Sequence, residues 1–369
     1  MTIGRQYLHK QLPRETHDEH ARELFICSVS EIVTKVFSKQ IRNIYLNKNK
    51  SSVCINFDEL NGAKLIKLLL QNNYYQMWSS LKRTNQEMLF DAVIEVAQKN
   101  DYNKDLKRLD YGSIKQNRNI KIPKYISKID IHCMPGGYVF EDSKNDLFAG
   151  KLYDRSLFLY AKGGLGNKNN EIGEATCEWI KKNLKKFNPN NILDMGCSIG
   201  SNTIPYCEHF PKAKINAVDL SGGMLRYAYL RSNEFKKNIH FSQQNAEYTN
   251  FNDNSFDLIV SHLLTHETSF KAYSNIINES YRLLKSKGIM IHVETDWFTK
   301  NNSFNKSLLE WETHYNAEPF KSTLDNIDQI QLLNKAGFDK KNIYQAKINS
   351  SKKGTKYFKG QWIGLVAKK

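Results

Sequence analysis

The second half of the chain alternates short apolar runs with segments in which apolar residues recur every three or four positions. The short runs predict strands, and the segments with helical spacing predict amphipathic helices. Strands are expected at residues 192–194, 215–219, 239–241, 256–261, 288–294, 343–348 and 362–367. Helices are expected at residues 172–184, 204–210, 223–235, 273–284 and 327–336. This alternation predicts an α/β domain over residues 170–369, with a seven-stranded, mostly parallel sheet covered by helices on both faces.

The first part of the chain has helical spacing instead. Thr16 and Glu19 form a capping-box pattern, and apolar residues then recur at helical spacing to near residue 45. Further helices are expected at residues 58–70, at residues 74–81, and from a second capping box at Thr84 and Glu87. We therefore expect a mainly α-helical domain over residues 1–125, which completes a ligand pocket or forms a dimer interface.

Residues 126–169 connect these two parts, after a charged stretch at residues 104–124 that predicts a linker or surface loop. Residues 129–133 alternate apolar and polar side chains, which predicts a strand, and residues 134–138 have the composition of a turn. The rest of the segment is rich in tyrosine and glycine. It is therefore either a lid over the binding site of the α/β domain or an ordinary connection.

Composition and short motifs indicate where the protein is located and whether it binds a metal. No apolar run approaches the roughly 18 residues needed to cross a bilayer, and the first ten residues lack the pattern of a signal peptide. The six cysteines are scattered without a CxxC pair, which is typical of reduced thiols and not of a zinc site. His17 and His20 have the spacing of a metal pair, but no third ligand is near. We therefore expect a cytoplasmic protein with no membrane contact and no metal.

The chain is basic, with 54 Lys and Arg against 38 Asp and Glu and a net charge of +16. This excess permits an anionic partner such as nucleic acid. Lysine is abundant throughout the chain, however, and aromatic residues are not interleaved with arginine as in a stacking platform for bases. A nucleic-acid partner is therefore not favoured.

The loop after the first strand of the expected sheet, residues 194–200, is the first place to look for a ligand. In open α/β sheets, ligands bind beyond the carboxyl ends of the strands. Gly196 and Gly200 allow a sharp turn and a close approach of the backbone to a ligand. Asp219 ends the second strand about 25 residues after Asp194, near the spacing at which an acidic residue receives ribose hydroxyls.

The same loop disfavours two common nucleotide ligands. It has no Gly-Lys-Ser/Thr sequence, which argues against a nucleoside triphosphate, and it lacks the third glycine of the dinucleotide motif. The carboxylate of Asp194 would repel a pyrophosphate but suits a ligand that carries an ammonium group and no phosphate. S-adenosylmethionine is such a ligand.

Several motifs in register resemble those of the Rossmann-like, class I S-adenosylmethionine-dependent methyltransferases. The first motif is residues 194–200, with Ser198 where a middle glycine is frequent. The further motifs are residues 218–225, 244–247 (with Asn245 where many members have Asp), 255–261, 283–288 and 336–338. The resemblance covers about residues 170–369 and implies the Rossmann-like fold, methyltransferase activity and S-adenosyl-L-methionine as cofactor.

The resemblance also implies roles for individual residues. Gly196 and the neighbouring backbone would hold the methionine part, with Asp194 near its ammonium group, and Asp219 would bind the ribose. Leu220 and Met224 would pack on adenine, unless they simply belong to the core. The expected cofactor contacts are Asp194, Gly196, Cys197, Ser198, Gly200, Asp219, Leu220, Met224, Asn245, Ala246, Glu247 and Ser261.

Candidates for the chemistry at the methyl acceptor follow the fourth strand. His262 and His266 are one helical turn apart, and Glu267 could orient an imidazole, so these three residues are the expected catalytic groups. The alternative is that they are polar residues at a helix start without a role. The expected acceptor contacts are Tyr138, Tyr153 and Trp78, although an aromatic stripe such as residues 74–78 more often packs in a core or an oligomer interface.

The sequence thus predicts a methyltransferase that acts on a small-molecule acceptor and could form a homodimer. The alternatives are an RNA or protein methyltransferase, a non-catalytic methyltransferase-like binding module, and a nicotinamide oxidoreductase.

Overall fold

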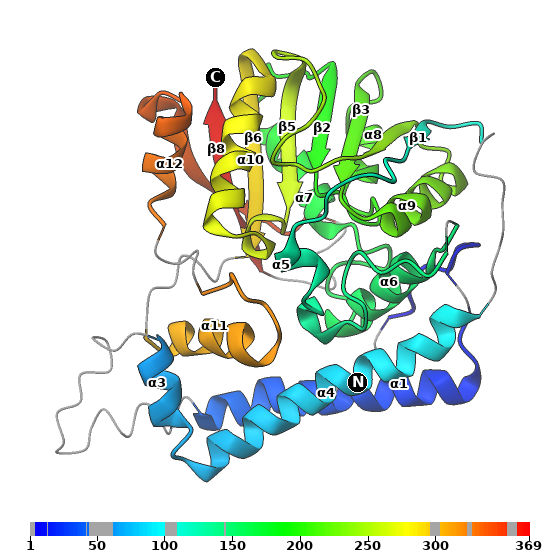
Figure 1. Ribbon diagram of the computed structural model, residues 1–369, viewed down its shortest axis with the longest axis vertical. Helices are drawn as coiled ribbons and strands as arrows, with labels where there is room; N and C mark the ends of the chain where they lie inside the picture. Colours follow the sequence, from blue (N-terminus) through cyan, green and yellow to red (C-terminus); the bar gives the residue numbers. More distant parts are fainter. Residues whose placement is uncertain are drawn as a thin grey trace.

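One sheet of eight strands organises the molecule (Figure 1). The computed structural model describes residues 4–12, 14–41, 43, 62–99, 109–143, 145–295, 303–322, 327–352 and 360–369. The strand order is β1-β4-β3-β2-β5-β6-β8-β7, parallel from β1 to β6 and antiparallel at the two pairs that involve β8. The strands are β1 (Ser113–Lys115), β2 (Asn191–Met195), β3 (Lys214–Asp219), β4 (Ile239–Gln243), β5 (Phe256–His262), β6 (Leu284–Thr295), β7 (Ile343–Asn349) and β8 (Gln361–Lys368).

This sheet confirms the predicted α/β class and all seven predicted strands. The additional strand, β1, lies in the charged stretch that was expected to be a linker or loop, and it extends the sheet beyond β4 with Ser113 opposite His240. Its three residues give no pattern long enough to be recognised as a strand, so its position depends on the tertiary contact.

Helices cover both faces of the sheet. They are α7 (Glu171–Asn183), α8 (Ile204–His209), α9 (Gly222–Glu234), α10 (Phe270–Leu283) and α12 (Gln329–Ala336). Successive side chains of a strand point to opposite faces. Accordingly, Ile192 of β2 packs in the cluster that contains Ile180 of α7, and the next residue, Leu193, packs in the cluster that contains Ile277 of α10.

The N-terminal part of the chain is helical, as predicted. Helix α1 (His17–Glu31) begins with the expected capping box: the Glu19 backbone N–H donates to Thr16 Oγ1 at 3.3 Å, and the Thr16 N–H donates to the Glu19 carboxylate at 2.7 Å. The helix continues through a π-helical turn, η1 (Ile32–Phe37). A short helix, α3 (Gly62–Leu69), and a long one, α4 (Asn73–Gln98), follow. The predicted helix start at Asp58 lies outside the described residues.

Helix α4 corrects one prediction. The sequence suggested a helix at residues 74–81 and a new one from Thr84, but both belong to α4, so no second capping box forms. The helix is capped instead by Asn72, whose side chain accepts hydrogen bonds from the N–H groups of Tyr74 and Tyr75. Neither glycine nor proline occurs within it, so the polar residues in its middle do not interrupt it.

The predicted strand at residues 129–133 is wrong. These residues include a 3₁₀ turn, η3 (Ile131–Cys133), in which His132 and Cys133 have φ values of 58° and 61°. Positive φ is incompatible with a strand. Of the alternating apolar residues Ile129, Ile131 and Cys133, only Ile131 is fully buried, so the pattern does not mark one buried face of a strand. A four-residue helix, α5 (Lys124–Ser127), precedes this turn, and α6 (Phe148–Tyr160) follows it.

Helix α6 joins the N-terminal helices to the α/β part. Figure 1 shows α1 and α4 side by side, beyond the carboxyl ends of the parallel strands. One apolar cluster contains Val93 of α4, Leu152 of α6 and Tyr227 of α9. Beside it, the buried Asp154 accepts hydrogen bonds from Tyr227, Asn169 and Gln6. The remaining elements are helix α11 (Ser303–Tyr315) and two short 3₁₀ turns, η4 (Thr265–Glu267) and η7 (Lys340–Asn342). Among the described helices, none is both long enough and apolar enough to cross a membrane.

Candidate active site

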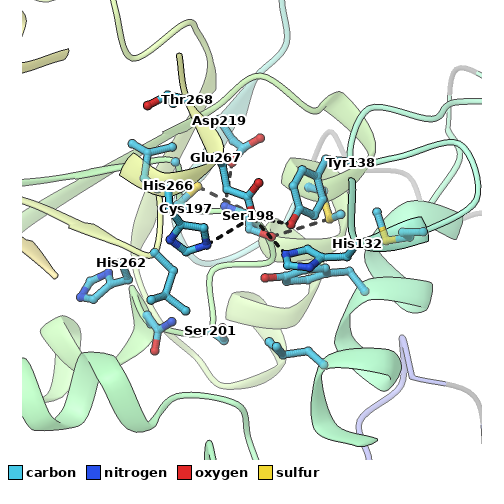
Figure 2. Close-up of a pocket in the computed structure, with 18 of the residues that line it drawn as sticks. His132, Tyr138, Cys197, Ser198, Ser201, Asp219, His262, His266, Glu267 and Thr268 are labelled. Carbon is cyan, nitrogen blue, oxygen red and sulfur yellow. Dashed lines mark hydrogen bonds and ion pairs between the residues drawn. The ribbon is translucent and has the colours of Figure 1, made fainter. Parts of the chain in front are cut away.

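A cavity of about 450 Å³ lies where the parallel strands β2, β3 and β5 end. Its volume falls within the range of about 300–1,000 Å³ that is typical of small-molecule sites. The loops that follow these strands form one wall. Residues from α4, α6 and the segment around η3 form the opposite wall. In Figure 2, His132, Tyr138, His266 and Glu267 converge beside the loop that carries Ser198.

The loop at residues 194–200 turns sharply beside the cavity. Gly196, Ser198 and Gly200 all have positive φ, of 70°, 48° and 69°. The N–H groups of Gly196 and Cys197 both donate to the carbonyl of Val218, at 2.8 and 3.0 Å, which holds the loop against the end of β3. Glycine is favoured at position 196 because its φ of 70° is rarely adopted by other residues, and a Cβ atom there would also displace the Leu264 side chain, 2.6 Å away.

Asp194, at the end of β2, is buried and lines the cavity. Its Oδ2 accepts a hydrogen bond from the Thr203 hydroxyl at 2.5 Å. Its Oδ1 accepts no hydrogen bond within the described part of the chain and lies 3.5 Å from His262 Nδ1. A buried carboxylate oxygen without a donor is costly unless a ligand supplies one. Asp194 therefore offers a site for a donor or a cation inside the cavity.

Asp219, at the end of β3, also lines the cavity. Its two carboxylate oxygens accept backbone N–H groups from Ser198 and Ser221, both at 2.8 Å. Burial raises the pKa of Asp219, while these N–H groups oppose the rise. The hydrogen bonds orient the carboxylate and leave one further lone pair on each oxygen for a ligand.

Most of the other expected cofactor contacts line the same cavity. They are Gly196, Cys197, Ser198, Leu220, Met224, Asn245, Ala246 and Glu247. Met224 lines the cavity and also belongs to the apolar core, so a contact with adenine and packing in the core are compatible. Asn245 is held by its side-chain oxygen, which accepts the N–H of Glu247 at 2.9 Å.

Three predicted residues do not line the cavity. Gly200 supports the loop from behind, where a Cβ atom would come within 3.3 Å of Ala228. Ser261 Oγ lies 2.5 Å from His292 Nδ1 inside the core. Trp78 is buried in a separate apolar cluster, where its ring lies 5.6 Å from that of Trp311. Trp78 is thus a core residue, in line with the alternative that the sequence favoured for this aromatic stripe.

The candidate catalytic and acceptor residues differ in their surroundings. His262 lies on the cofactor side, near Asp194, with its Nε2 3.1 Å from the Tyr206 hydroxyl. His266 and Glu267 lie on η4 and face the opposite wall, where the Tyr138 hydroxyl donates to Glu267 Oε1 at 3.0 Å. The Tyr153 ring packs edge-on against Tyr138 at 5.7 Å.

The sequence did not predict a role for His132, which lies beside His266 and Glu267. His132 Nε2 lies 3.1 Å from Glu267 Oε1, and its Nδ1 lies 3.2 Å from Glu318 Oε1. His266 Nε2 also faces Glu267, at 3.4 Å, and its Nδ1 lies 2.6 Å from Glu294 Oε2. We call His132, His266, Glu267, Glu294 and Glu318 the polar cluster. No local spacing links these residues, because they come from four separate segments.

Burial and neighbouring charges shift the pKa values in the polar cluster in opposite directions. Burial alone would lower the pKa of His132, but the carboxylates of Glu318 and Glu267 raise it to about 10. Burial would likewise lower the pKa of His266, but the carboxylates of Glu294 and Glu267 raise it to about 10. Burial would raise the pKa of Glu267, but the two histidines lower it to about 2. Without a bound cation, protons on the two imidazoles therefore balance the carboxylates.

Known proteins resemble the part of the chain that carries the loop at residues 194–200. Residues 192–288 match the family model of a methyltransferase domain. The demethylmenaquinone methyltransferase of Lactococcus lactis is 32% identical over 122 residues, which cover 32% of this chain and 48% of that protein. The malonyl-[acyl-carrier protein] O-methyltransferase of Acetivibrio thermocellus is 31% identical over 103 residues, 27% of this chain and 34% of that protein. The chain spans about half the length of these relatives or less.

Among solved structures, Haemonchus contortus phosphoethanolamine N-methyltransferase 2 in complex with S-adenosyl-L-methionine aligns with 60% of this chain and 59% of that chain, at 20% identity and a TM-score of 0.42. From the family match and the strand order, the chain carries a methyltransferase domain of the Rossmann-like, class I type that its motifs resemble.

Proposed function

We propose that this protein transfers a methyl group from S-adenosyl-L-methionine to a small-molecule acceptor. The observation that carries the proposal is the position of Asp194. Its buried Oδ1 accepts no hydrogen bond among the described residues, and Asp194 lines a cavity that Asp219, His132, His266 and Glu267 also line. This arrangement suits a cofactor with an ammonium group at one end and ribose hydroxyls at the other.

The residues of the first wall fit this cofactor. Asp194 Oδ1 would accept from the ammonium group, which removes the cost of the orphaned oxygen. The free lone pairs of Asp219 would accept the ribose hydroxyls. Leu220 and Met224 would contact the adenine ring, with Asn245 and Ala246 at its polar edge.

The second wall would hold the acceptor. Gln86, Leu89 and Phe90 of α4 line the cavity, so the N-terminal helical part would complete the acceptor pocket. Tyr138 and Tyr153 add aromatic surface next to the polar cluster. Enclosure by these side chains would exclude water and align the acceptor with the methyl group.

The transfer itself needs little assistance from the protein. When bound, S-adenosyl-L-methionine supplies a methyl carbon to which the acceptor atom bonds as the carbon–sulfur bond breaks and its electron pair stays on sulfur. An acceptor hydroxyl or ammonium group must also lose a proton, and the polar cluster is the group of side chains placed to bind and polarise it.

Small acceptors are also consistent with the relatives. The matched proteins are named demethylmenaquinone methyltransferase and malonyl-[acyl-carrier protein] O-methyltransferase, and neither name specifies a nucleic acid. The cavity is enclosed largely by buried and half-buried side chains, which favours a small molecule over a long polymer.

Calorimetry with S-adenosyl-L-methionine and, separately, with NAD tests the proposal. We expect one S-adenosyl-L-methionine per chain and no heat from NAD, since the loop lacks the third glycine of a dinucleotide site. Binding of NAD alone would contradict the proposal. Binding of neither ligand would show that it does not use this cofactor.

A further inference from the structure

We propose that the polar cluster binds one divalent first-row transition-metal ion, such as Zn²⁺, at the acceptor end of the cavity. The ligands would be His132 Nε2, His266 Nε2 and the carboxylate of Glu267. Two histidines and one carboxylate with open positions are a ligand set that recurs at catalytic zinc and non-haem iron sites. Metal binding can be measured by itself, but its role at the acceptor rests on the proposed function.

The ligand atoms already converge. His132, His266, Glu267 and Glu318 each offer one ligand atom, and these atoms all lie within 4.8 Å of one another. Nε2 of His132 and Nε2 of His266 lie 3.1 and 3.4 Å from the same oxygen, Glu267 Oε1. Ligands at about 2.0–2.1 Å from a tetrahedral zinc ion are about 3.3 Å apart. The ion would therefore enter with only small side-chain movements.

Each histidine is also oriented as metal ligands usually are. A ligating imidazole commonly has its other nitrogen hydrogen-bonded to a carboxylate, which fixes the tautomer and the ring plane. His266 Nδ1 lies 2.6 Å from Glu294 Oε2. His132 Nδ1 lies 3.2 Å from Glu318 Oε1. Both rings thus direct Nε2 toward Glu267 and keep Nδ1 for an outer carboxylate.

The backbone places these side chains at some cost. His132 has a φ of 58°, a conformation that non-glycine residues adopt rarely and that often accompanies functional sites. Gln86 of α4 donates to the carbonyl of His132 at 3.0 Å and so holds this turn in place. Glu294 Oε1 accepts the N–H of Thr265 at 2.9 Å, which fixes the turn that carries His266.

Charge also favours a cation. The polar cluster contains three carboxylates, and Lys321 pairs with one of them, Glu318, at 2.5 Å. With neutral imidazoles, two negative charges therefore stay uncompensated in a buried place, which one divalent ion would balance. Glu267 Oε1, near which both Nε2 atoms lie, also accepts from the Tyr138 hydroxyl at 3.0 Å, and Oε2 accepts no hydrogen bond among the described residues, so the carboxylate keeps an oxygen available for the ion.

A second histidine–carboxylate group provides a contrast. Glu15, His20 and Glu23 also bring three potential ligand atoms together. There, however, the guanidinium of Arg155 contacts both carboxylates and supplies the positive charge. No arginine contacts Glu267 or Glu294 in the ion pairs of the described residues. Among the described residues, Glu267 and Glu294 have no such fixed cation, so only protons on the imidazoles or a metal ion can balance their charge.

A metal ion at this place defines the class of acceptor. Its open positions would take an oxygen or nitrogen atom of the acceptor, and coordination lowers the pKa of a bound hydroxyl or amine. The acceptor would then be a molecule with a metal-coordinating oxygen or nitrogen at or beside the methylated atom. The histidines would act as ligands, and the proton of the coordinated, acidified group would pass to water, so no side-chain base would be needed.

The test is metal binding to the full-length protein after treatment with a chelator. Titration with Zn²⁺ should saturate at one ion per chain, and titration with Co²⁺ should give the visible absorption of a site with fewer than six ligands. Mg²⁺ should not compete at equal concentration, since it prefers six oxygen ligands. His132→Asn, His266→Asn and Glu267→Gln should each weaken binding at least about tenfold, whereas His17→Asn, an exposed histidine, should not.

A Glu318→Gln variant provides a graded check. Loss of an outer carboxylate should weaken binding about 10- to 100-fold and leave the stoichiometry at one. Circular dichroism of each variant separates loss of the site from loss of the fold. If the ligand variants unfold, the visible Co²⁺ spectrum of the wild-type protein decides whether the metal site exists: absorption of a site with fewer than six ligands supports it, and the spectrum of six-coordinate Co²⁺ contradicts it.

Either of two results would overturn the metal site: no saturable Zn²⁺ or Co²⁺ uptake by the wild-type chain, or uptake that Glu267→Gln leaves unchanged. Calorimetry with S-adenosyl-L-methionine, done without metal, reports separately on the proposed function. The two proposals can therefore fail independently.

Discussion

Two aspartates at the ends of neighbouring strands have different hydrogen-bond environments. Asp219 has both oxygens oriented by backbone N–H groups, whereas Asp194 has one oxygen bound to Thr203 and one without a donor. A fully oriented carboxylate suits neutral hydroxyls, and an unpartnered buried oxygen suits a charged donor. The two residues would thus recognise the two ends of one ligand.

Asp219→Ala should weaken binding of S-adenosyl-L-methionine by about 1.5–3 kcal/mol, because hydrogen bonds to a charged group are lost. Calorimetry measures this loss, and thermal unfolding shows whether the variant still folds. Asp18→Ala, at an exposed position on α1, is the control and should leave affinity unchanged. Near-unchanged binding in Asp219→Ala would mean that the ribose site lies elsewhere.

The sequence located most of the first wall of the site but, on the opposite side, only Tyr138 and Tyr153. Asp194, Gly196 and Asp219 were found because a strand, a turn and a helix follow one another along the chain, and local spacing then fixes their positions. His132 and Glu318 lie far apart in the sequence and meet only through η3 and the segment after α11. The residues around them carry no periodic signal, so nothing in the sequence indicated that these two side chains meet.

At the scale of elements, the buried carboxylate of Asp154 joins three parts of the molecule. It lies on α6, accepts from Tyr227 of α9 and from Gln6 near the N-terminus, and faces Arg231 at 3.6 Å. Burial would raise the pKa of Asp154, but Arg231 and the hydrogen bonds hold the pKa well below its usual value. The ionised form therefore stabilises the fold.

Asp154→Asn should lower the free energy of unfolding by about 3 kcal/mol at neutral pH, because it leaves the Arg231 charge without a carboxylate. A pKa that is depressed in the folded state gives stability above the unfolded value of about 3.9, and this stability is lost as pH falls below it. Denaturant titrations at pH 7 and near pH 3 should show the difference from wild type shrink at the lower pH. A difference that stays constant would mean that the charge of Asp154 is not what stabilises.

Helix α4 contributes to the site through Gln86, which holds the His132 carbonyl. Gln86→Leu should weaken Zn²⁺ binding about fivefold, from loss of one hydrogen bond of about 1 kcal/mol, without changing the affinity for S-adenosyl-L-methionine. Gln98→Leu, exposed near the end of the same helix, is the matched control. Equal loss of both ligands in Gln86→Leu would instead indicate a general disturbance of the cavity.

The errors in the predicted elements have a common origin. Strands and helices of the sheet region were predicted because buried strands and amphipathic helices have strong periodicity. Residues 129–133 have the spacing of a strand but include a 3₁₀ turn, in which the backbone at His132 is left-handed. Helix α4 was divided because polar residues in its middle resembled a capping box, which matters only where a helix begins.

At the scale of the whole molecule, the N-terminal helices are part of one packed unit with the methyltransferase domain. Ile26 of α1 and Phe90 of α4 pack in the same cluster as Met224 and Leu230 of α9. Gln86, Leu89 and Phe90 of α4 also line the cavity. The helical part therefore contributes both to stability and to the proposed acceptor pocket.

Removal of residues 1–99 should consequently prevent cooperative folding, because it exposes the apolar surfaces of α6 and α9. Size-exclusion chromatography and thermal unfolding of the truncated chain test this expectation. A monodisperse fragment that unfolds cooperatively and binds S-adenosyl-L-methionine as the full chain does would contradict it, and would show that residues 100–369 fold without the N-terminal helices.

The most direct test of the account is a crystal structure of the protein with S-adenosylhomocysteine bound. The account predicts the amino group of the ligand at Asp194 Oδ1, its ribose at Asp219 and its sulfur facing the polar cluster across the open part of the cavity. A sulfur atom that faces away from His266 and Glu267, or a ligand bound outside this cavity, would contradict it.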